Sequence, residues 1–284
     1  MLPVNTSGLR VANNPASQNV TKFEETADMT LMKDFDNSKE NIIKNDYNKN
    51  KVLVICGPTA TGKTKLALQL AKEFNGELIA ADSRQVYVGN DLETGKDKDI
   101  LGNTKIWLMD IVEEKNDFSV SQWRRLAQEA IKDILARGKL PIVVGGSGLY
   151  IKALVENLSD VDAPRDEELR KSNKTAIELF NCLKNIDYVK AASLNNSDRN
   201  NPRRLIRAIE IGLHKRSSSV LARGPLAKVR YLQIGLIASK EILEERIKQR
   251  VRDRGLSEGF VKKEINIMKK QLVWFKKQPN IVWW

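Results

Sequence analysis

Residues 52–64, which read VLVICGPTATGKT, decide the fold of this chain. The apolar run Val52–Cys56 has the length and composition of a buried β-strand, and Gly57–Thr64 fits the phosphate-loop pattern G-x-x-x-x-G-K-[ST]. In such a loop the glycines let backbone N–H groups turn towards phosphate oxygens at the N-terminus of the next helix. The pattern is shared with ATP-binding and other nucleotide-binding proteins, so a diphosphate or triphosphate is the expected ligand.

Every residue of this loop is a candidate phosphate ligand, and two have further roles. Lys63 adds a positive charge, and the Thr64 hydroxyl can bind Mg²⁺. Apolar residues recur at helical spacing after Thr64, and Asn75-Gly76 supply a helix stop. A glycine-containing turn without a ligand is the alternative interpretation, but the flanking strand and helix weigh against it. We therefore assign diphosphate or nucleotide binding to Gly57, Pro58, Thr59, Ala60, Thr61, Gly62, Lys63 and Thr64.

The length of the chain and its cysteines limit the classes of protein to which it can belong. At 284 residues, the chain has room for one large core with a smaller inserted part. Cys56 and Cys182 stand far apart and form no C-x-x-C pair, which is typical of a reducing cytoplasm and indicates neither disulfides nor a zinc site. No apolar run reaches the roughly 18 residues that a membrane span needs, and the N-terminus lacks a signal-peptide pattern. We expect a cytoplasmic monomer with no membrane partner.

The net charge of +12 is concentrated near the C-terminus. Residues 203–284 contain 20 Lys/Arg against 7 Asp/Glu, a local charge of +13, which leaves about −1 for the rest of the chain. A basic surface either improves solubility or binds a polyanion, and charge alone does not decide between these two roles.

Apolar runs and helical patterns alternate from Lys51 onwards. This order predicts an α/β fold with a P-loop NTPase-like parallel sheet flanked by helices and an inserted helical subdomain. The predicted strands are residues 52–56, 77–81, 106–111, 141–144 and 229–237. The predicted helices are 65–74, 119–137, 149–156, 167–173, 176–184, 187–193, 202–213, 240–253 and 257–275.

These elements divide the chain into four regions. Residues 1–49 lack a periodic apolar face and are predicted to be a disordered arm. Residues 50–156 are the P-loop core, 157–201 the helical insertion, and 202–284 a return to the core with basic C-terminal helices.

Two polar segments follow predicted strands and should lie at the ligand edge of the sheet. Asp82–Tyr87 come directly after the second strand, and Gly145–Gly148 form a turn after the strand 141–144. A carboxylate at Asp82 would face the ligand, although Asp at a strand exit also commonly caps the next turn. The glycine turn has the alternative of simple turn chemistry.

Together, the phosphate loop, Asp82–Tyr87 and Gly145–Tyr150 resemble the signature of the tRNA dimethylallyltransferases, the P-loop isopentenyltransferases that modify adenosine beside the anticodon. Further resembling segments are Asp91–Lys96, Leu108–Ile111, Ala136–Ile142, Asn201–Glu210 and Gln271–Phe275. The similarity extends over about residues 51–275, and the combination is much more specific than a phosphate loop alone.

The resemblance implies the partners tRNA and dimethylallyl diphosphate, and assigns roles. Lys63, Thr64 with Mg²⁺, and Arg246 would bind the donor diphosphate, and Asp82 would accept the proton of the adenosine amine. A solvated helix charge is the alternative for Arg246. The adenosine would leave its stack to enter the site. The residues implied in tRNA contacts are Asp82, Ser83, Arg84, Gln85, Ser147, Arg170, Arg203, Arg204, Leu205, Ile206 and Arg207.

The chain departs from the family pattern in two places. The stretch between Gly255 and Gln271 is much shorter than in the family, and Ile106-Trp107 replace a common histidine pair. Two other functions stay open, the first because Ile106–Asp110 also resembles an apolar strand that ends in a Mg²⁺-binding Asp, and the second because of the shortened stretch. One is a P-loop small-molecule kinase, with Asp110 organising Mg²⁺ and Arg246, Arg250 and Arg252 forming a lid. The other is a shortened homologue that binds tRNA without turnover.

Overall fold

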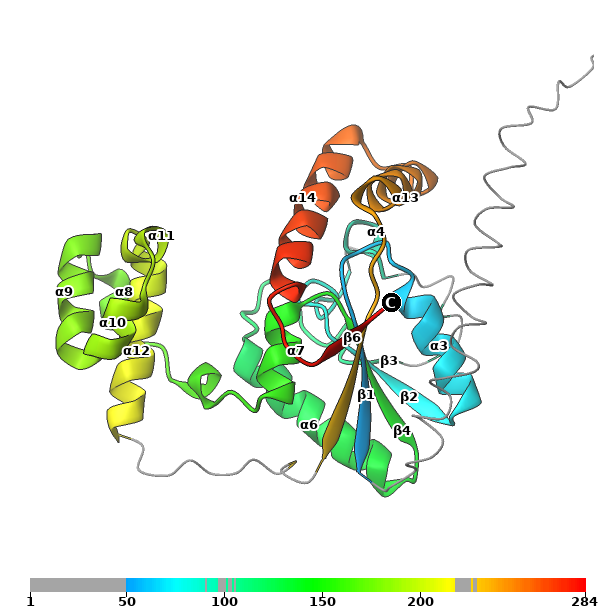
Figure 1. Ribbon diagram of the computed structural model, residues 1–284, viewed down its shortest axis with the longest axis horizontal. Coiled ribbons are helices and arrows are strands. Elements are labelled where there is room, and N and C mark those ends of the chain that lie inside the picture. Colours follow the sequence, from blue (N-terminus) through cyan, green and yellow to red (C-terminus); the bar gives the residue numbers. More distant parts are fainter. Residues whose placement is uncertain are drawn as a thin grey trace, which may run out of the picture. The chain divides into compact units, whose positions relative to one another are not determined.

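A computed structural model describes residues 50–89, 91–96, 101, 104, 106–217, 226 and 229–284 (Figure 1). The predicted disordered arm, residues 1–49, lies outside this part of the chain. The strands are β1 Lys51–Cys56, β2 Gly76–Ala80, β3 Ile106–Trp107, β4 Leu140–Gly145, β5 Arg230–Gly235 and β6 Ile281–Trp283. The helices of the first half are α3 Lys63–Glu73, α4 Asp91–Thr94, α6 Val120–Ala136 and α7 Gly148–Val155. Those of the second half are the 3-10 helix η1 Ser159–Asp162, α8 Glu167–Lys171, α9 Ala176–Ile186, α10 Tyr188–Ser193, α11 Asn196–Arg199, α12 Pro202–Ser217, α13 Lys240–Asp253 and α14 Glu258–Phe275.

The six strands form one parallel sheet in the order β3-β2-β4-β1-β5-β6, which confirms the predicted α/β class. Residues 52–56 of β1 are all buried, as expected for a central strand covered on both faces. Since all strands run the same way, the loops after β1, β2 and β4 meet at one edge of the sheet. The phosphate loop, Asp82 and the turn after Gly145 are therefore neighbours.

Helices cover both faces of this sheet. Figure 1 shows α3 on one face and α6 with α7 on the other, as right-handed crossovers require. Helix α6 starts with the predicted capping box between Ser119 and Gln122 and stops before Gly138, whose φ is 68°. Trp123 of α6 is fully buried, donates to the Ala80 carbonyl at 3.0 Å, and so ties α6 to the end of β2.

The third predicted strand, 106–111, is wrong beyond Trp107. Leu108 and Asp110 have φ values of 64° and 54°, so the backbone leaves the extended conformation and forms a turn. Of the apolar residues that predicted a longer strand, Leu108 is buried in the core, Met109 lines a cavity and Ile111 is exposed.

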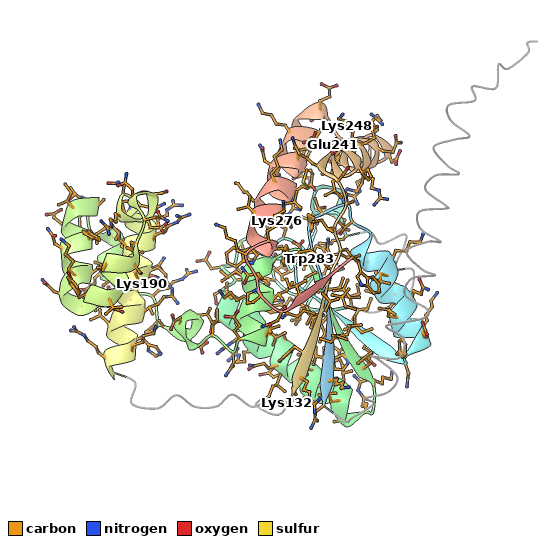
Figure 2. All side chains as sticks on the ribbon, viewed as in Figure 1. Lys132, Lys190, Glu241, Lys248, Lys276 and Trp283 are labelled. Atoms are coloured by element: carbon orange, nitrogen blue, oxygen red, sulfur yellow. The ribbon has the colours of Figure 1, made fainter. Side chains whose placement is uncertain are left out.

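Strand β6 is not among the strands predicted from the sequence. It pairs in parallel with β5 and forms an edge of the sheet, with Trp283 (labelled in Figure 2) packed against the bare backbone of Gly235. Helices α13 and α14 lie between β5 and β6 in the chain and pack on each other through Leu243, Ile247, Val251 and Met268. The apolar side predicted for the last helix is thereby confirmed.

The helical region has a small core of its own. Leu179 and Leu183 of α9 pack against Leu205 and Ile209 of α12, and each is almost completely buried. Helix α12 therefore belongs to the helical cluster, and the predicted boundary after residue 201 cuts through it. The physical reason for this assignment of α12 is its apolar stripe, which packs against α9. Among the described helices, none combines the length and apolarity of a transmembrane segment.

Candidate functional site

A cavity of about 280 Å³ lies at the carboxyl edge of the sheet. Residues from the phosphate loop, from the loop after β2, from the turn after β4 and from helices α13 and α14 line it. The predicted site residues among them are Thr59, Ala60, Gly62, Lys63, Thr64, Asp82, Arg84 and Gln85. Its apolar lining includes Leu101, Ile106 and Met109, so one cavity offers both charged and apolar walls.

The phosphate loop is held tightly by its neighbours. A Cβ at Gly57, where φ is 134°, would overlap the carbonyl oxygen of Leu236, so a side chain is excluded. Gly62 has a φ of 84° and precedes α3, whose N-terminus opens onto the cavity. The Lys63 ammonium donates to the Pro58 carbonyl at 2.6 Å, and the Thr61 hydroxyl donates to the same carbonyl at 2.9 Å.

Asp82 lines the cavity two residues beyond the end of β2. One of its carboxylate oxygens accepts from the Arg84 backbone N–H at 2.9 Å. The capping role considered from sequence is therefore present. It occupies one oxygen, which leaves the carboxylate able to bind a second donor.

The turn after β4 supports the Asp82 loop. The Ser147 hydroxyl oxygen accepts from the Ser83 backbone N–H at 2.8 Å, and the Ser147 N–H donates to the Ala81 carbonyl at 3.0 Å. The two predicted residues Ser83 and Ser147 are therefore hydrogen-bonded to each other, next to the cavity-lining residues Asp82 and Gly146. Gln85 donates to the Gly95 carbonyl at 2.9 Å, which joins the same loop to the end of α4.

Two arginines of α13 reach the phosphate loop. Arg246, which the sequence analysis assigned to the diphosphate, donates to the Ala60 carbonyl at 3.4 Å. Arg250 lines the cavity and donates to the Thr59 hydroxyl at 2.9 Å and to Glu264 at 2.8 Å. From the sequence, Arg250 was predicted to bind phosphate only in the kinase alternative. Its position one helical turn after Arg246, on the same face of the helix, was the available signal.

Glu264 and Lys96 are buried ions beside the cavity that sequence reasoning did not single out. The other oxygen of Glu264 accepts from Arg84 at 3.0 Å, so this carboxylate joins α14 to both α13 and the Asp82 loop. The fully buried Lys96 ammonium bonds Asp91 at 2.9 Å, Asp110, and the Tyr87 carbonyl at 2.7 Å. It fixes the backbone that follows the Asp82 loop.

Residues predicted from the Asn201–Glu210 segment divide into buried and exposed positions. Leu205 and Ile206 are in the core of the helical cluster, so contacts of their side chains with tRNA do not fit the structure. Both side chains belong to the apolar face of α12, which packs against α9. Arg203 is exposed, whereas Arg204 is exposed and paired with Asp198.

Arg170 and Arg207 share the buried carboxylate of Glu210. Arg170 binds both of its oxygens, at 2.7 and 3.0 Å, and Arg207 binds one at 2.9 Å. Arg207 also donates to the Ala163 and Asp160 carbonyls at 2.9 and 2.8 Å. Much of their hydrogen-bonding capacity is used inside the protein, which indicates a structural role for both guanidinium groups.

Thr64 is the predicted metal ligand in the site. The described residues contain no group of three or more His, Cys, Asp or Glu placed to hold a metal ion by themselves. A lone hydroxyl at a helix N-terminus still fits Mg²⁺, because that ion prefers oxygen ligands and commonly takes most of them from phosphate and water. Burial raises the pKa of the nearby Cys56 thiol to about 12, against the opposing charge of Lys63, so this thiol is not a nucleophile at neutral pH.

The chain matches known proteins over most of its length. The family model described as IPP transferase matches residues 85–271. A tRNA dimethylallyltransferase of Acetivibrio thermocellus is 42% identical over 224 residues, which cover 75% of this chain and 70% of that protein. The tRNA dimethylallyltransferase 2 of Treponema denticola is 37% identical, with 80% of this chain and 76% of that protein covered.

Solved structures agree with these matches. The full-length tRNA isopentenylpyrophosphate transferase of Bacillus halodurans is 30% identical, with a TM-score of 0.55, and 83% of this chain and 89% of that chain are covered. A eukaryotic dimethylallyltransferase, solved in snapshots of its action on tRNA, is 27% identical with a TM-score of 0.60, covering 82% of this chain and 58% of that chain.

Proposed function

This chain belongs to the IPP transferase family, and we propose that it transfers the dimethylallyl group of dimethylallyl diphosphate to the exocyclic amine of an adenosine next to the anticodon of tRNA. The observation that carries the proposal is that the phosphate loop and Asp82 line one cavity. A diphosphate anchored by the loop and an amine hydrogen-bonded to Asp82 would meet there.

The donor half of the reaction uses the loop and its cations. Backbone N–H groups at the start of α3, together with Lys63, would bind the diphosphate and stabilise the charge that grows on it as the allylic C–O bond breaks. Arg250 and Arg246 of α13 would add positive charge on the opposite side of the loop. The apolar wall with Leu101, Ile106 and Met109 would suit the hydrocarbon tail.

The acceptor half uses Asp82. The amine nitrogen forms a bond to the first carbon of the dimethylallyl group, the bond from that carbon to the diphosphate oxygen breaks, and the diphosphate leaves with the electron pair. The proton lost by the amine passes to the Asp82 carboxylate, whose loop is fixed by Ser147, Gln85 and Lys96. The target base would have to leave its stack to reach this carboxylate.

The Thr64 hydroxyl and the diphosphate oxygens are the groups that would hold Mg²⁺. When bound, Mg²⁺ would offset negative charge on the departing diphosphate. We propose that the protein acts on tRNA in the cytoplasm and that it acts as a monomer.

The alternative of a small-molecule kinase has less support. The family match covers residues 85–271, which begin after the phosphate loop, so it rests on segments that a kinase assignment leaves unexplained. Only an activity measurement distinguishes the transferase from a homologue that binds tRNA without turnover.

The test is to incubate the full chain with unmodified tRNA, dimethylallyl diphosphate and Mg²⁺, then to analyse the tRNA nucleosides by mass spectrometry. We expect prenylated adenosine with the wild type, and about 10²- to 10⁴-fold less per unit time with Asp82→Asn, which keeps the shape but loses the base. Unmodified adenosine from the wild type, with tRNA bound, would favour the non-transferring homologue. In a parallel incubation with ATP and small metabolites, phosphoryl transfer to a metabolite would favour the kinase.

A further inference from the structure

We propose that Gln271 is a positioning residue for the transfer reaction, which sets the distance between the phosphate loop and the Asp82 loop. The inference rests on the proposed function and adds to it a residue that would act through the two loops it joins. The contacts of one side-chain amide carry it.

The Gln271 amide bonds to two different loops at once. Its Oε1 accepts from the Thr59 N–H of the phosphate loop at 2.8 Å, and its Nε2 donates to the Gly146 carbonyl at 3.1 Å. These partners lie 212 and 125 residues away in sequence. One side chain therefore spans from the loop after β1 to the turn after β4.

The residue after Gly146 is hydrogen-bonded to both neighbours of Asp82. The next residue, Ser147, accepts from the Ser83 N–H at 2.8 Å and donates its own N–H to the Ala81 carbonyl at 3.0 Å. Ala81 and Ser83 flank Asp82 on both sides. A shift of the Gly146 carbonyl would consequently move the backbone that carries the proposed base.

Packing holds Gln271 in place. A Cβ at Gly146 would overlap the Gln271 amide, so glycine is what lets the two approach. Met268, one turn earlier in α14, is fully buried against α13, and Phe275, one turn later, is 1% exposed in the main core. A helix fixed on both sides of Gln271 leaves its side chain little freedom, which is what positioning requires.

An amide is needed at this position because one end must accept and the other must donate. Methionine has the length of glutamine without strong hydrogen bonds, and asparagine keeps the amide on a stem that is one methylene shorter. Gln278 supplies a matched control, since its amide donates at 3.2 Å to the Trp274 carbonyl and does not line the cavity.

The experiment compares the wild type, Gln271→Met, Gln271→Asn and Gln278→Met. It measures single-turnover prenyl transfer at saturating dimethylallyl diphosphate and tRNA, equilibrium binding of each substrate, thermal unfolding, and hydrogen exchange of peptides covering 57–62 and 145–149. With both Gln271 variants we expect the single-turnover rate to fall about 10- to 100-fold, the scale of an ångström-sized misplacement. Substrate affinities should change less than about threefold, while the two peptides exchange faster.

Several outcomes would overturn the inference. If the wild type transfers prenyl groups and the Gln271 variants do so at the same rate, Gln271 does not position the loops. If donor affinity falls as much as the rate, it is a binding residue. If both variants lose their thermal transition and Gln278→Met does not, its role is structural. A wild type without transfer contradicts the proposed function instead, and the exchange data still report whether Gln271 joins the two loops.

Discussion

Lys63 donates to the Pro58 carbonyl of its own loop, so its charge already lies at the phosphate site. Its helix, α3, presents its N-terminus to the same cavity. Lys63→Ala should lower prenyl transfer about 10²- to 10³-fold, because it removes charge that stabilises the departing diphosphate. The affinity for tRNA should change less than about twofold, since Lys63 faces the donor diphosphate and most tRNA contacts would lie outside the phosphate loop. Transfer of a labelled prenyl group and filter binding measure the two effects.

Lys72→Ala is the matched control for Lys63, because Lys72 is exposed at the far end of the same helix. It should leave both measurements unchanged. Near-normal transfer by Lys63→Ala at saturating donor would remove this lysine from the mechanism.

Glu77 lies at the start of β2, at the edge of the sheet opposite the cavity. Its ion pair makes the stability of the protein depend on pH. Arg137 at 2.8 Å holds the pKa of this carboxyl well below its ordinary value, against partial burial and with help from Lys139 and Trp107. Since the pKa is lower in the folded state, the stabilisation is fully present above about pH 4.5 and is lost as the pH falls through the lowered pKa.

Glu77→Gln should therefore lower the melting temperature by about 2–4 °C near pH 7, as expected for about 1 kcal/mol in a domain of this size. The difference from the wild type should shrink steadily below pH 4.5. Glu129→Gln, an exposed change on α6, should match the wild type throughout. A Glu77→Gln deficit that stays constant down to pH 2 would contradict this linkage.

At the scale of elements, Gly145 at the end of β4 lies so close to the backbone after β2 that no side chain fits there. A Cβ at Gly145 would overlap the Ala81 carbonyl oxygen, and a backbone neighbour has little room to yield. Gly145→Ala should therefore cost about 1–3 kcal/mol or more and lower the melting temperature accordingly. Thermal unfolding by circular dichroism measures it.

Gly259→Ala is the control, because Gly259 is in the first turn of α14 with its nearest neighbour atom at 3.7 Å. Alanine there should be neutral or stabilise the helix by up to about 1 kcal/mol. Equal melting temperatures for the two variants would show that β4 and the Asp82 loop are not in close contact.

Glu210 joins α12 to the segment that leads into the helical cluster. Burial opposes its charge, but the bonds from Arg170, the Asp166 N–H and Arg207 outweigh burial and keep the pKa of Glu210 below its usual value. Glu210→Ala should destabilise the cluster by less than the about 3–5 kcal/mol of a fully buried pair, because the Arg170 and Arg207 side chains are 34% and 30% exposed and can be rehydrated.

Faster hydrogen exchange in α9 and α12 with unchanged exchange in β1 and β4 would report this local loss. Glu156→Ala breaks an exposed pair with Lys152 at 3.8 Å and should change neither region. An unchanged α12 in Glu210→Ala would show that the apolar core of the cluster is sufficient.

At the scale of the molecule, charge is distributed unevenly, with +13 over residues 203–284. The affinity for tRNA should accordingly fall steeply with salt. Arg203 is exposed, whereas Arg207 is bonded to Glu210, so Arg203→Gln is the cleaner test of a phosphate contact. It should reduce the slope of log affinity against log salt by about 0.7 to 0.9, as one lost contact would.

Filter binding of tRNA over a salt series measures this slope. Lys132→Gln should leave it unchanged, because Lys132 (labelled in Figure 2) lies in the second half of α6, which runs back from the carboxyl edge. A weaker affinity for Arg203→Gln without a change in slope would indicate contact with a loop base instead. No dependence on salt in the wild type would contradict tRNA binding through this basic region.

The sequence by itself determined the class of fold and the loop that binds phosphate. Val52–Thr64 and the alternation of runs and helices are local patterns, and local patterns follow from backbone sterics, spacing and capping, as at Ser119 and Gly138. The order of the segments also placed Asp82 and the Gly145–Gly148 turn at the same edge, because parallel strands share their carboxyl end.

The tertiary structure alone decided which side chains meet. Arg250, Gln271 and Glu264 reach the cavity because α13 and α14 fold back over the loops, and no local pattern encodes contacts across 125 to 212 residues. Burial of Leu205 and Ile206 likewise depends on α9 as the partner of α12. An apolar stripe states that a helix has a buried face, but the neighbour that covers it is chosen by the packing of the whole chain.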